Sequence, residues 1–163
     1  MQLKIEKLNH TGQGIAKKDN LIYFIPKTVE NDIIEPQSIT EHKNYNQVTK
    51  YKLITKSPNR EPIPCPYYKY CGGCQLLQLN YQNQLNYKKE KVINIFQKYT
   101  KININLQILS TNPYKYRNKI TLQVKNNKIG LYQENTNEII EIKKCLLINF
   151  SLQRRQTYTF ILF

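Results

Sequence analysis

Three cysteines lie within ten residues of this 163-residue chain, in the stretch CPYYKYCGGC from residue 65 to residue 74. The chain has only four cysteines, and the fourth, Cys145, comes much later in the sequence. Clustered cysteines in a reducing compartment more often bind a metal than form disulfides. A shared ligand set would tie the loop to a distant segment. The position of the four cysteines therefore constrains the fold more than any other feature of the sequence.

The spacing of the clustered cysteines narrows the kind of centre they would hold. Cys65, Cys71 and Cys74 have the pattern C-x5-C-x2-C. Four thiolates close a tetrahedral zinc site or hold a 4Fe–4S cluster, and Gly72-Gly73 permits the tight turn between two of them. A three-plus-one arrangement is less typical of zinc and favours the cluster. Zinc and simple buried thiols both stay open, because a cysteine beside apolar neighbours, as Cys145 is, often only fills the core.

The chain is strongly basic. It has 25 Lys and Arg residues against 11 acidic ones, and its formal net charge is +14. This balance favours a polyanionic partner such as nucleic acid, although the abundance of Asn, Ile, Lys and Tyr is also what an AT-rich coding genome would give. No apolar run is long enough for a membrane span, and the start does not read as a secretory signal. We therefore expect a cytoplasmic protein with no membrane partner.

Residues 1–57 read as a small all-β domain. Four strands are predicted in the stretches LKIEKL, LIYFIP, NDIIEPQSI and NQVTKYKLIT, because apolar and polar residues alternate and turns separate them. Several short strands in fewer than 60 residues indicate a closed barrel of the OB kind. The proline-rich stretch that follows, SPNREPIP, would be a stiff boundary.

Residues 58–150 are predicted to form a second domain. After the cysteine loop, residues 79–99 have apolar side chains at helical spacing and predict one helix. Four alternating runs then predict an antiparallel sheet, namely NINLQIL, NKITLQVK, KIGLYQEN and EIIEIKK, with a hairpin turn at residues 125–128. The fold class is thus a β-rich α+β fold. Residues 151–163 match nothing before them and form a divergent tail.

Three stretches carry a resemblance to a known family. EKLNHTGQGIAKKDNLIYFIP resembles the start of a TRAM domain, a small RNA-binding barrel. CPYYKYCGGCQLLQLNYQNQLNYKKEKV resembles the iron–sulfur segment of the TRAM-containing RNA uracil-5-methyltransferases, and NPYKYRNKITLQV and IIEIKKCLLIN are similar to later parts of their central domain. The resemblance implies that a 4Fe–4S cluster is held by Cys65, Cys71, Cys74 and Cys145. It also implies that the partner is rRNA or tRNA, and DNA is not expected.

The same resemblance implies that the catalytic part of such an enzyme is missing from this sequence. Such enzymes add a cysteine thiolate to C6 of a flipped-out uracil and then methylate C5 from S-adenosylmethionine. The nucleophile and the cofactor pocket belong to a Rossmann-like domain that this sequence does not supply, so we assign no catalytic residue and no S-adenosylmethionine site. We expect the amino-terminal portion of the enzyme, truncated by a frameshift or premature stop and inactive alone. The alternatives are half of a split methyltransferase with a separate catalytic chain, and a zinc-stapled RNA-binding or structural module.

Candidate RNA contacts are few. Tyr116, Arg117 and Lys119 form a basic and aromatic run that is predicted to begin a strand. On the barrel, Tyr23 and Phe24 would stack on bases, although ordinary packing within the strand explains them at least as well.

Overall fold

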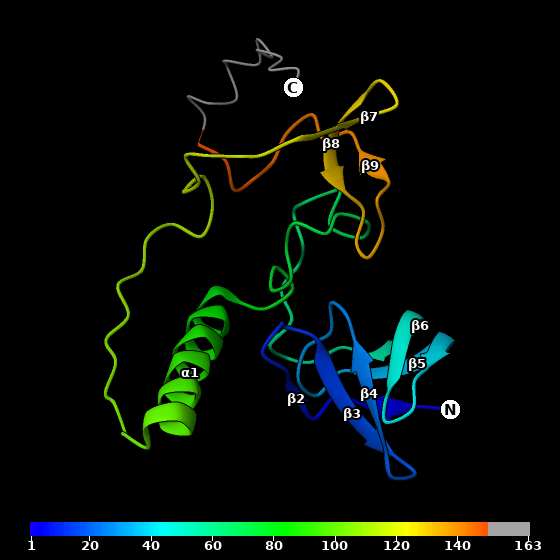
Figure 1. Ribbon diagram of the computed structural model, residues 1–163, viewed down its shortest axis with the longest axis vertical. Coiled ribbons are helices and arrows are strands. Elements are labelled where there is room, and N and C mark those ends of the chain that lie inside the picture. The colour runs from blue at the N-terminus through cyan, green and yellow to red at the C-terminus, as the bar shows by residue number, and fades with distance from the viewer. Residues whose placement is uncertain (150–163) are drawn as a thin grey trace. The chain divides into compact units, whose positions relative to one another are not determined.

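The computed structural model describes residues 1–149, and these divide into two compact units. The first unit contains residues 1–63 and 75–108, and the second contains residues 64–74 together with the chain from Leu109 onward. Within the described residues, one helix and two sheets account for the regular structure (Figure 1). The predicted β-rich α+β class, with a single helix, is therefore confirmed. The predicted division near residue 57 stays a prediction, and the divergent tail at residues 151–163 lies outside the described residues.

The first unit is built on a six-stranded mixed sheet with the order β1-β5-β6-β4-β3-β2. The strands are β1 (Leu3–Lys4), β2 (Lys7–Leu8), β3 (Gly14–Lys18), β4 (Leu21–Ile25), β5 (Ile33–Glu41) and β6 (Asn46–Thr55). All neighbours pair antiparallel except β4 and β6, which are parallel. The edge strands β1 and β2 are adjacent in the chain, so the sheet curls to bring its two edge strands near each other.

The first predicted strand is split where the chain passes from one edge of this sheet to the other. The amide of Ile5 donates to the carbonyl of Asp32, 2.9 Å away, on the β5 side, and the amide of Glu6 donates to Ile15, 2.8 Å away, on β3. The prediction of one continuous strand over residues 3–8 was wrong for this reason. Strand β3 was not predicted at all, because its inward positions carry the small residues Gly14 and Ala16 rather than large apolar side chains.

Apolar side chains from five strands or their connections fill the inside of the curled sheet. This core contains Leu3, Ile5, Ala16, Tyr23, Ile25, Ile34 and Val48, with Tyr51 and Leu53 packed against it. Burial of this kind contributes roughly 25 cal/mol for each Å² of apolar surface removed from water. The first unit therefore has a hydrophobic core of its own.

A buried carboxylate secures the end of the sheet. Asp32 is fully buried and accepts hydrogen bonds from the amides of Val29 (2.7 Å) and Ser57 (2.9 Å). It also pairs with the guanidinium of Arg60, whose Nη2 donates to the carbonyl of Lys27 at 3.1 Å. Because Arg60 lies in the proline-rich stretch, this network fixes that stretch against the sheet.

Helix α1 (Tyr81–Thr100) agrees with the predicted helix to within two residues. The side chain of Asn80 caps its first turn by accepting from the amide of Asn83 at 2.8 Å, and Lys101, in the left-handed conformation with φ of 60°, ends it. No residue of the helix is buried, but Tyr87 Oη donates to the carbonyl of Asn9, 2.7 Å away. No helix among residues 1–149 has the length and apolarity to cross a membrane.

The second unit carries a three-stranded antiparallel sheet of β7 (Gln123–Lys125), β8 (Lys128–Tyr132) and β9 (Ile139–Ile140). The predicted hairpin turn is confirmed, since Lys125 pairs with Lys128 across Asn126 and Asn127, whose φ values are 51° and 59°. Asparagine tolerates these positive φ angles. The strand predicted at NINLQIL is wrong, because no strand is formed between Thr100 and Gln123.

Candidate metal centre

All four cysteines line one cavity of about 160 Å³ in the second unit. Three of them come from the loop at residues 65–74, and Cys145 comes from the segment after β9. None of the four forms a disulfide. Apolar side chains such as Leu131 and Leu147 form part of the wall, and Arg117 and Lys119 add two cationic groups. The structure thus brings together the residues that the sequence singled out as one ligand set.

The cysteine loop is shaped by hydrogen bonds within its own backbone. The amide of Tyr68 donates to the carbonyl of Cys65 at 3.2 Å, and the amide of Cys71 donates to that of Tyr67 at 2.8 Å. These successive turns bring Cys65 and Cys71 to the same cavity although five residues separate them. The long C-x5-C gap is therefore taken up by a coiled stretch of backbone.

The end of the loop pairs with the sheet of the second unit. The amide of Gly72 donates to the carbonyl of Tyr132 at 3.1 Å, and the amide of Glu134 donates to that of Tyr70 at 2.8 Å. A Cβ atom on Gly72 would stand 3.3 Å from that same Tyr132 oxygen and 3.3 Å from Glu134 Cα. Glycine at this position thus permits a close approach between the two backbones.

The segment that carries Cys145 is paired with the run YKYRNK. The amide of Lys115 donates to the carbonyl of Leu146 at 3.0 Å, and the amide of Arg117 donates to that of Leu147 at 2.8 Å. The amide of Asn149 donates a hydrogen bond to the carbonyl of Arg117 at 2.9 Å. Arg117 is therefore held beside the cysteine cavity by its backbone, which spacing in the sequence does not reveal.

Without a bound cation, the cavity disfavours the deprotonation of several of its cysteines at once. Burial, followed by the nearby thiols of Cys145, Cys71 and Cys65, raises the pKa of Cys74 to about 11, although Arg117 acts in the opposite direction. The amide of Gly73 donates to Cys71 Sγ at 3.4 Å. A bound cation would remove the mutual repulsion, because metal binding favours the deprotonated ligands.

Sharing a cavity does not by itself make the cysteines a metal site. Within residues 1–149, no group of three or more His, Cys, Asp or Glu side chains is arranged so that it could hold a metal ion. The four cysteines line one cavity, and what they bind stays a prediction.

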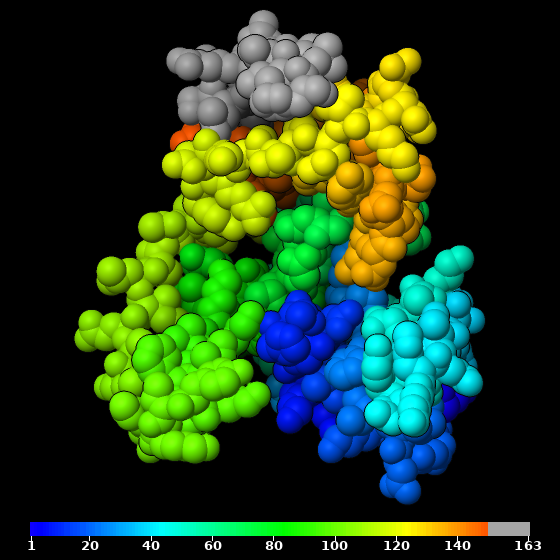
Figure 2. Space-filling view, viewed as in Figure 1, coloured from blue at the N-terminus to red at the C-terminus, as the bar shows by residue number. Residues whose placement is uncertain are grey.

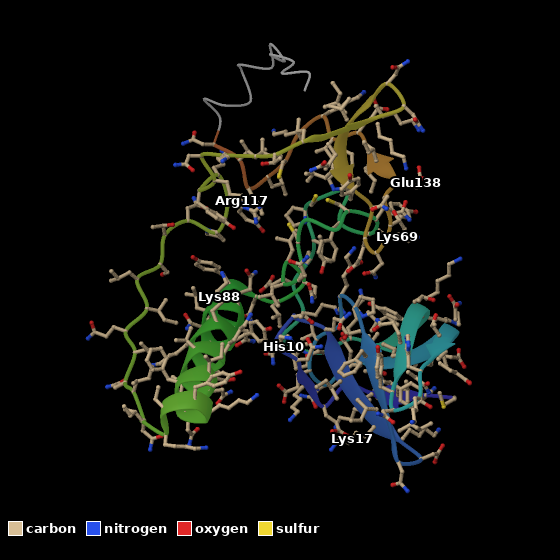
Figure 3. The ribbon with its side chains drawn as sticks, in the orientation of Figure 1. His10, Lys17, Lys69, Lys88, Arg117 and Glu138 are labelled. Carbon is tan, nitrogen blue, oxygen red and sulfur yellow. The ribbon has the colours of Figure 1, made fainter. Side chains whose placement is uncertain are left out.

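The three candidate RNA contacts occupy different positions, and their role stays a prediction. Tyr116 is 53% exposed, and the guanidinium of Arg117 lies 5.9 Å from the centre of its ring. Arg117, labelled in Figure 3, and Lys119 line the cysteine cavity. The run does not begin a strand as predicted, because β7 begins only at Gln123. Its backbone pairs instead with the Cys145 segment.

The two candidate base-stacking residues of the first unit, Tyr23 and Phe24, lie on opposite faces of strand β4. Tyr23 is 5% exposed and belongs to the core, which agrees with the packing interpretation rather than with base stacking. Phe24 points to the opposite face and contacts Tyr45, a residue that the sequence did not single out. The signal that was missed is the short aromatic loop HKNY between β5 and β6.

Comparison with known proteins gives relatives that are named RNA methyltransferases. An uncharacterized RNA methyltransferase of Staphylococcus aureus (strain COL) is 38% identical over 148 residues, which are 86% of this chain and 33% of that protein. An uncharacterized RNA methyltransferase of Aquifex aeolicus is 30% identical over 150 residues, which are 90% of this chain and 35% of that protein. A scan against protein-family models gave no match.

A solved structure agrees with these relatives. The crystal structure of Pyrococcus abyssi tRNA (uracil-54, C5)-methyltransferase in complex with S-adenosyl-L-homocysteine matches with a TM-score of 0.67 at 25% identity. The match covers 94% of this chain and 34% of that one. The resemblance predicted from the sequence is confirmed: the chain is a relative of the RNA methyltransferases and spans about one third of the length of the curated relatives it matches.

Proposed function

We propose that this chain is the RNA-binding and cluster-binding part of an RNA uracil-5-methyltransferase, and that Cys65, Cys71, Cys74 and Cys145 hold a 4Fe–4S cluster. One observation carries the proposal, namely that cysteines from two distant segments line a single cavity. The similarity to RNA methyltransferases, one of them a tRNA (uracil-54, C5)-methyltransferase, supports the substrate class.

The cysteine set and its surroundings fit the proposed cluster. Four cysteines supply the usual thiolate ligands of such a group, and the N–H of Gly73, directed at Cys71 Sγ, is the kind of donor that stabilises an anionic cluster. When bound, the cluster would act as a structural cross-link between the loop and the segment after β9. Methylation of uracil requires no electron transfer, so no redox role is assigned to it.

The first unit is proposed to be a TRAM-like OB barrel that binds RNA. Its support is the curled sheet whose edge strands β1 and β2 are adjacent in the chain, and residues 1–57 carry nine Lys residues against six acidic ones. Contacts from Lys and Arg to phosphates would supply most of the affinity and make it strongly dependent on salt. We include Tyr116 of the second unit as an exposed aromatic contact.

The methyl-transfer step is assigned to the part of the relatives that this chain does not cover. S-adenosylmethionine is the proposed methyl donor, because a relative of known structure was crystallised with S-adenosyl-L-homocysteine. No residue of this chain is assigned to that cofactor.

Anaerobic purification with metal analysis tests the cluster. We expect about four iron atoms and about four sulfide ions for each chain, with a brown colour and absorption near roughly 400 nm. One zinc ion for each chain without iron would overturn the cluster and leave the zinc-stapled alternative.

Titration with single-stranded RNA at several salt concentrations tests the second half of the proposal. The expected result is binding that weakens steadily as salt rises. Absence of binding even at low salt would overturn the RNA-binding role while leaving the metal result unaffected.

A further inference from the structure

We propose that His42, Tyr45 and Phe24 form a stacking site for the bases of single-stranded RNA on the outer face of the six-stranded sheet. We call these three residues the aromatic platform. This inference rests on the proposed RNA binding and gives it a location. It is carried by the ring contacts, the exposure and the charge of the residues described below.

The alternation of β4 places Phe24 on the outside of the curled sheet. Tyr23 and Ile25 are buried in the core, so the residue between them points the other way. Phe24 lies beside Ile15 of β3 and Gln47 of β6 in the strand register. This position at the middle of three paired strands gives the ring a rigid support.

The loop between β5 and β6 brings two further rings to Phe24. The amide of His42 donates to the carbonyl of Tyr45 at 2.9 Å and closes the loop. The rings of His42 and Tyr45 are stacked, with centroids 4.4 Å apart and planes 19° from parallel. Tyr45 meets Phe24 edge-on, with centroids 5.4 Å apart. The three rings therefore form one continuous aromatic surface.

This surface remains open to solvent. Tyr45 is 36% exposed and His42 is also exposed. In Figure 2 the hairpin of β5 and β6, in cyan, forms part of the visible surface of the first unit. Exposed rings that are already stacked have lost their rotational freedom before a ligand arrives, so adding another flat ring costs little further entropy.

Cationic side chains lie near the platform. Lys43 is in the same loop, and Lys17 lies opposite Ile22, which shares the outer face of β4 with Phe24. Figure 3 labels Lys17 on this sheet. One acidic residue, Glu41, ends β5 next to the loop. Aromatic rings flanked by cations suit a strand whose bases and phosphates alternate.

Single-stranded RNA is the occupant that this chemistry favours. Every base offers a flat face for stacking, and in a duplex those faces are covered by neighbouring base pairs. The platform requires no defined hydrogen-bonding edge, so it would tolerate different bases. We therefore expect it to position an unpaired segment without reading its sequence.

The test measures binding of a fluorescein-labelled oligouridylate of about 12 nucleotides, a length near the upper range for one OB fold. Tyr45→Ala is expected to weaken binding at least about fivefold, the loss of one base stack. Tyr45→Phe, which keeps the ring, is expected to stay within about twofold of the unaltered chain. The matched control is Tyr99→Ala, because Tyr99 is 75% exposed on α1, outside the platform.

Salt dependence separates stacking from charge. Lys43→Gln is expected to reduce the slope of log K against log salt, whereas Tyr45→Ala should lower affinity and leave that slope unchanged. The same oligonucleotide annealed into a duplex should be insensitive to Tyr45→Ala. Unaltered melting temperatures for all variants would show that the sheet still folds.

Two failures are distinguishable. If the unaltered chain binds RNA and Tyr45→Ala binds equally well, the platform is overturned and the proposed function stands. If the unaltered chain binds no RNA, both are overturned. Equal losses in Tyr45→Ala and Tyr99→Ala would also overturn the platform, because the effect would not be local.

Discussion

The two units of this chain are stabilised in different ways. The first buries a set of large apolar side chains inside a curled sheet and adds a buried ion pair between Asp32 and Arg60. In the second, the buried apolar residues among those described are few, namely Tyr68, Cys71, Leu147 and Ile148. These residues lie around the cavity that the four cysteines share.

The difference indicates which unit depends on a bound group. A small domain with little buried apolar surface needs a metal, a disulfide or a partner to be stable. We therefore expect the first unit to fold by its own core and the second to fold around what its cysteines bind. The predictions below test this contrast, beginning with the largest expected effect.

Loss of one cysteine should unfold the second unit and spare the first. Cys74→Ser removes a proposed ligand, so iron should be lost and the amides of β7 to β9 should exchange with solvent rapidly. The amides of β3, β4 and β6 should keep their protection in the same hydrogen-exchange experiment. Thr121→Val, which changes a cavity residue without sulfur, is the control and should keep its iron. Full iron content in Cys74→Ser would show that the ligand assignment is wrong.

Loss of the buried Asp32 carboxylate should destabilise the first unit and spare the second. Asp32→Asn leaves the charge of Arg60 without its counter-ion in a site where Asp32 is fully buried and the Arg60 side chain is 12% exposed. Breaking such a pair costs about 3–5 kcal/mol. Urea denaturation should show this loss in the first unit, while iron binding is unchanged. The exposed neighbour Glu30, changed to Gln, should cost less than about 0.5 kcal/mol.

A smaller effect is expected from crowding the inside of the sheet. A Cβ atom on Gly14 would stand 2.1 Å from Thr28 Oγ1 and 2.8 Å from Ile5 Cγ2. Gly14→Ala should therefore destabilise the first unit by about 1–3 kcal/mol, as overpacking does in cores. Gly73→Ala, in the other unit, meets no atom closer than 3.4 Å. Its denaturation curve for the first unit should superimpose on that of the unaltered chain.

Local patterns in the sequence predicted the parts of the fold that depend on local chemistry. The turn between Lys125 and Lys128 was predictable, because two asparagines adopt the required positive φ. Helix α1 was predictable from its spacing alone, although none of its residues is buried. The stretch NINLQIL alternates like a strand, yet it forms none. A strand also needs a neighbouring strand to pair with, and the local sequence does not show whether one is available.

The candidate site was predictable in its ligands but not in its surroundings. The spacing of the cysteines and the resemblance together pointed to the four residues that share the cavity. The position of Arg117 beside them follows from backbone pairing with Leu147 and Asn149, which connects segments far apart in the chain. The aromatic platform was missed for a similar reason, since Phe24 and Tyr45 meet only after β4 and β6 pair.

The adjacency of β1 and β2 at opposite edges has a consequence for folding during synthesis. The first eight residues leave the ribosome before any of the others, but Leu3 pairs with Ile34, and β5 is completed by β6, which ends at Thr55. Strand β2 finds its partner β3 only a few residues later, but β1 stays unpaired until β5 has emerged. Contacts of such separation in the chain slow folding. Strand β1, the first strand made, is therefore paired later than its neighbour β2.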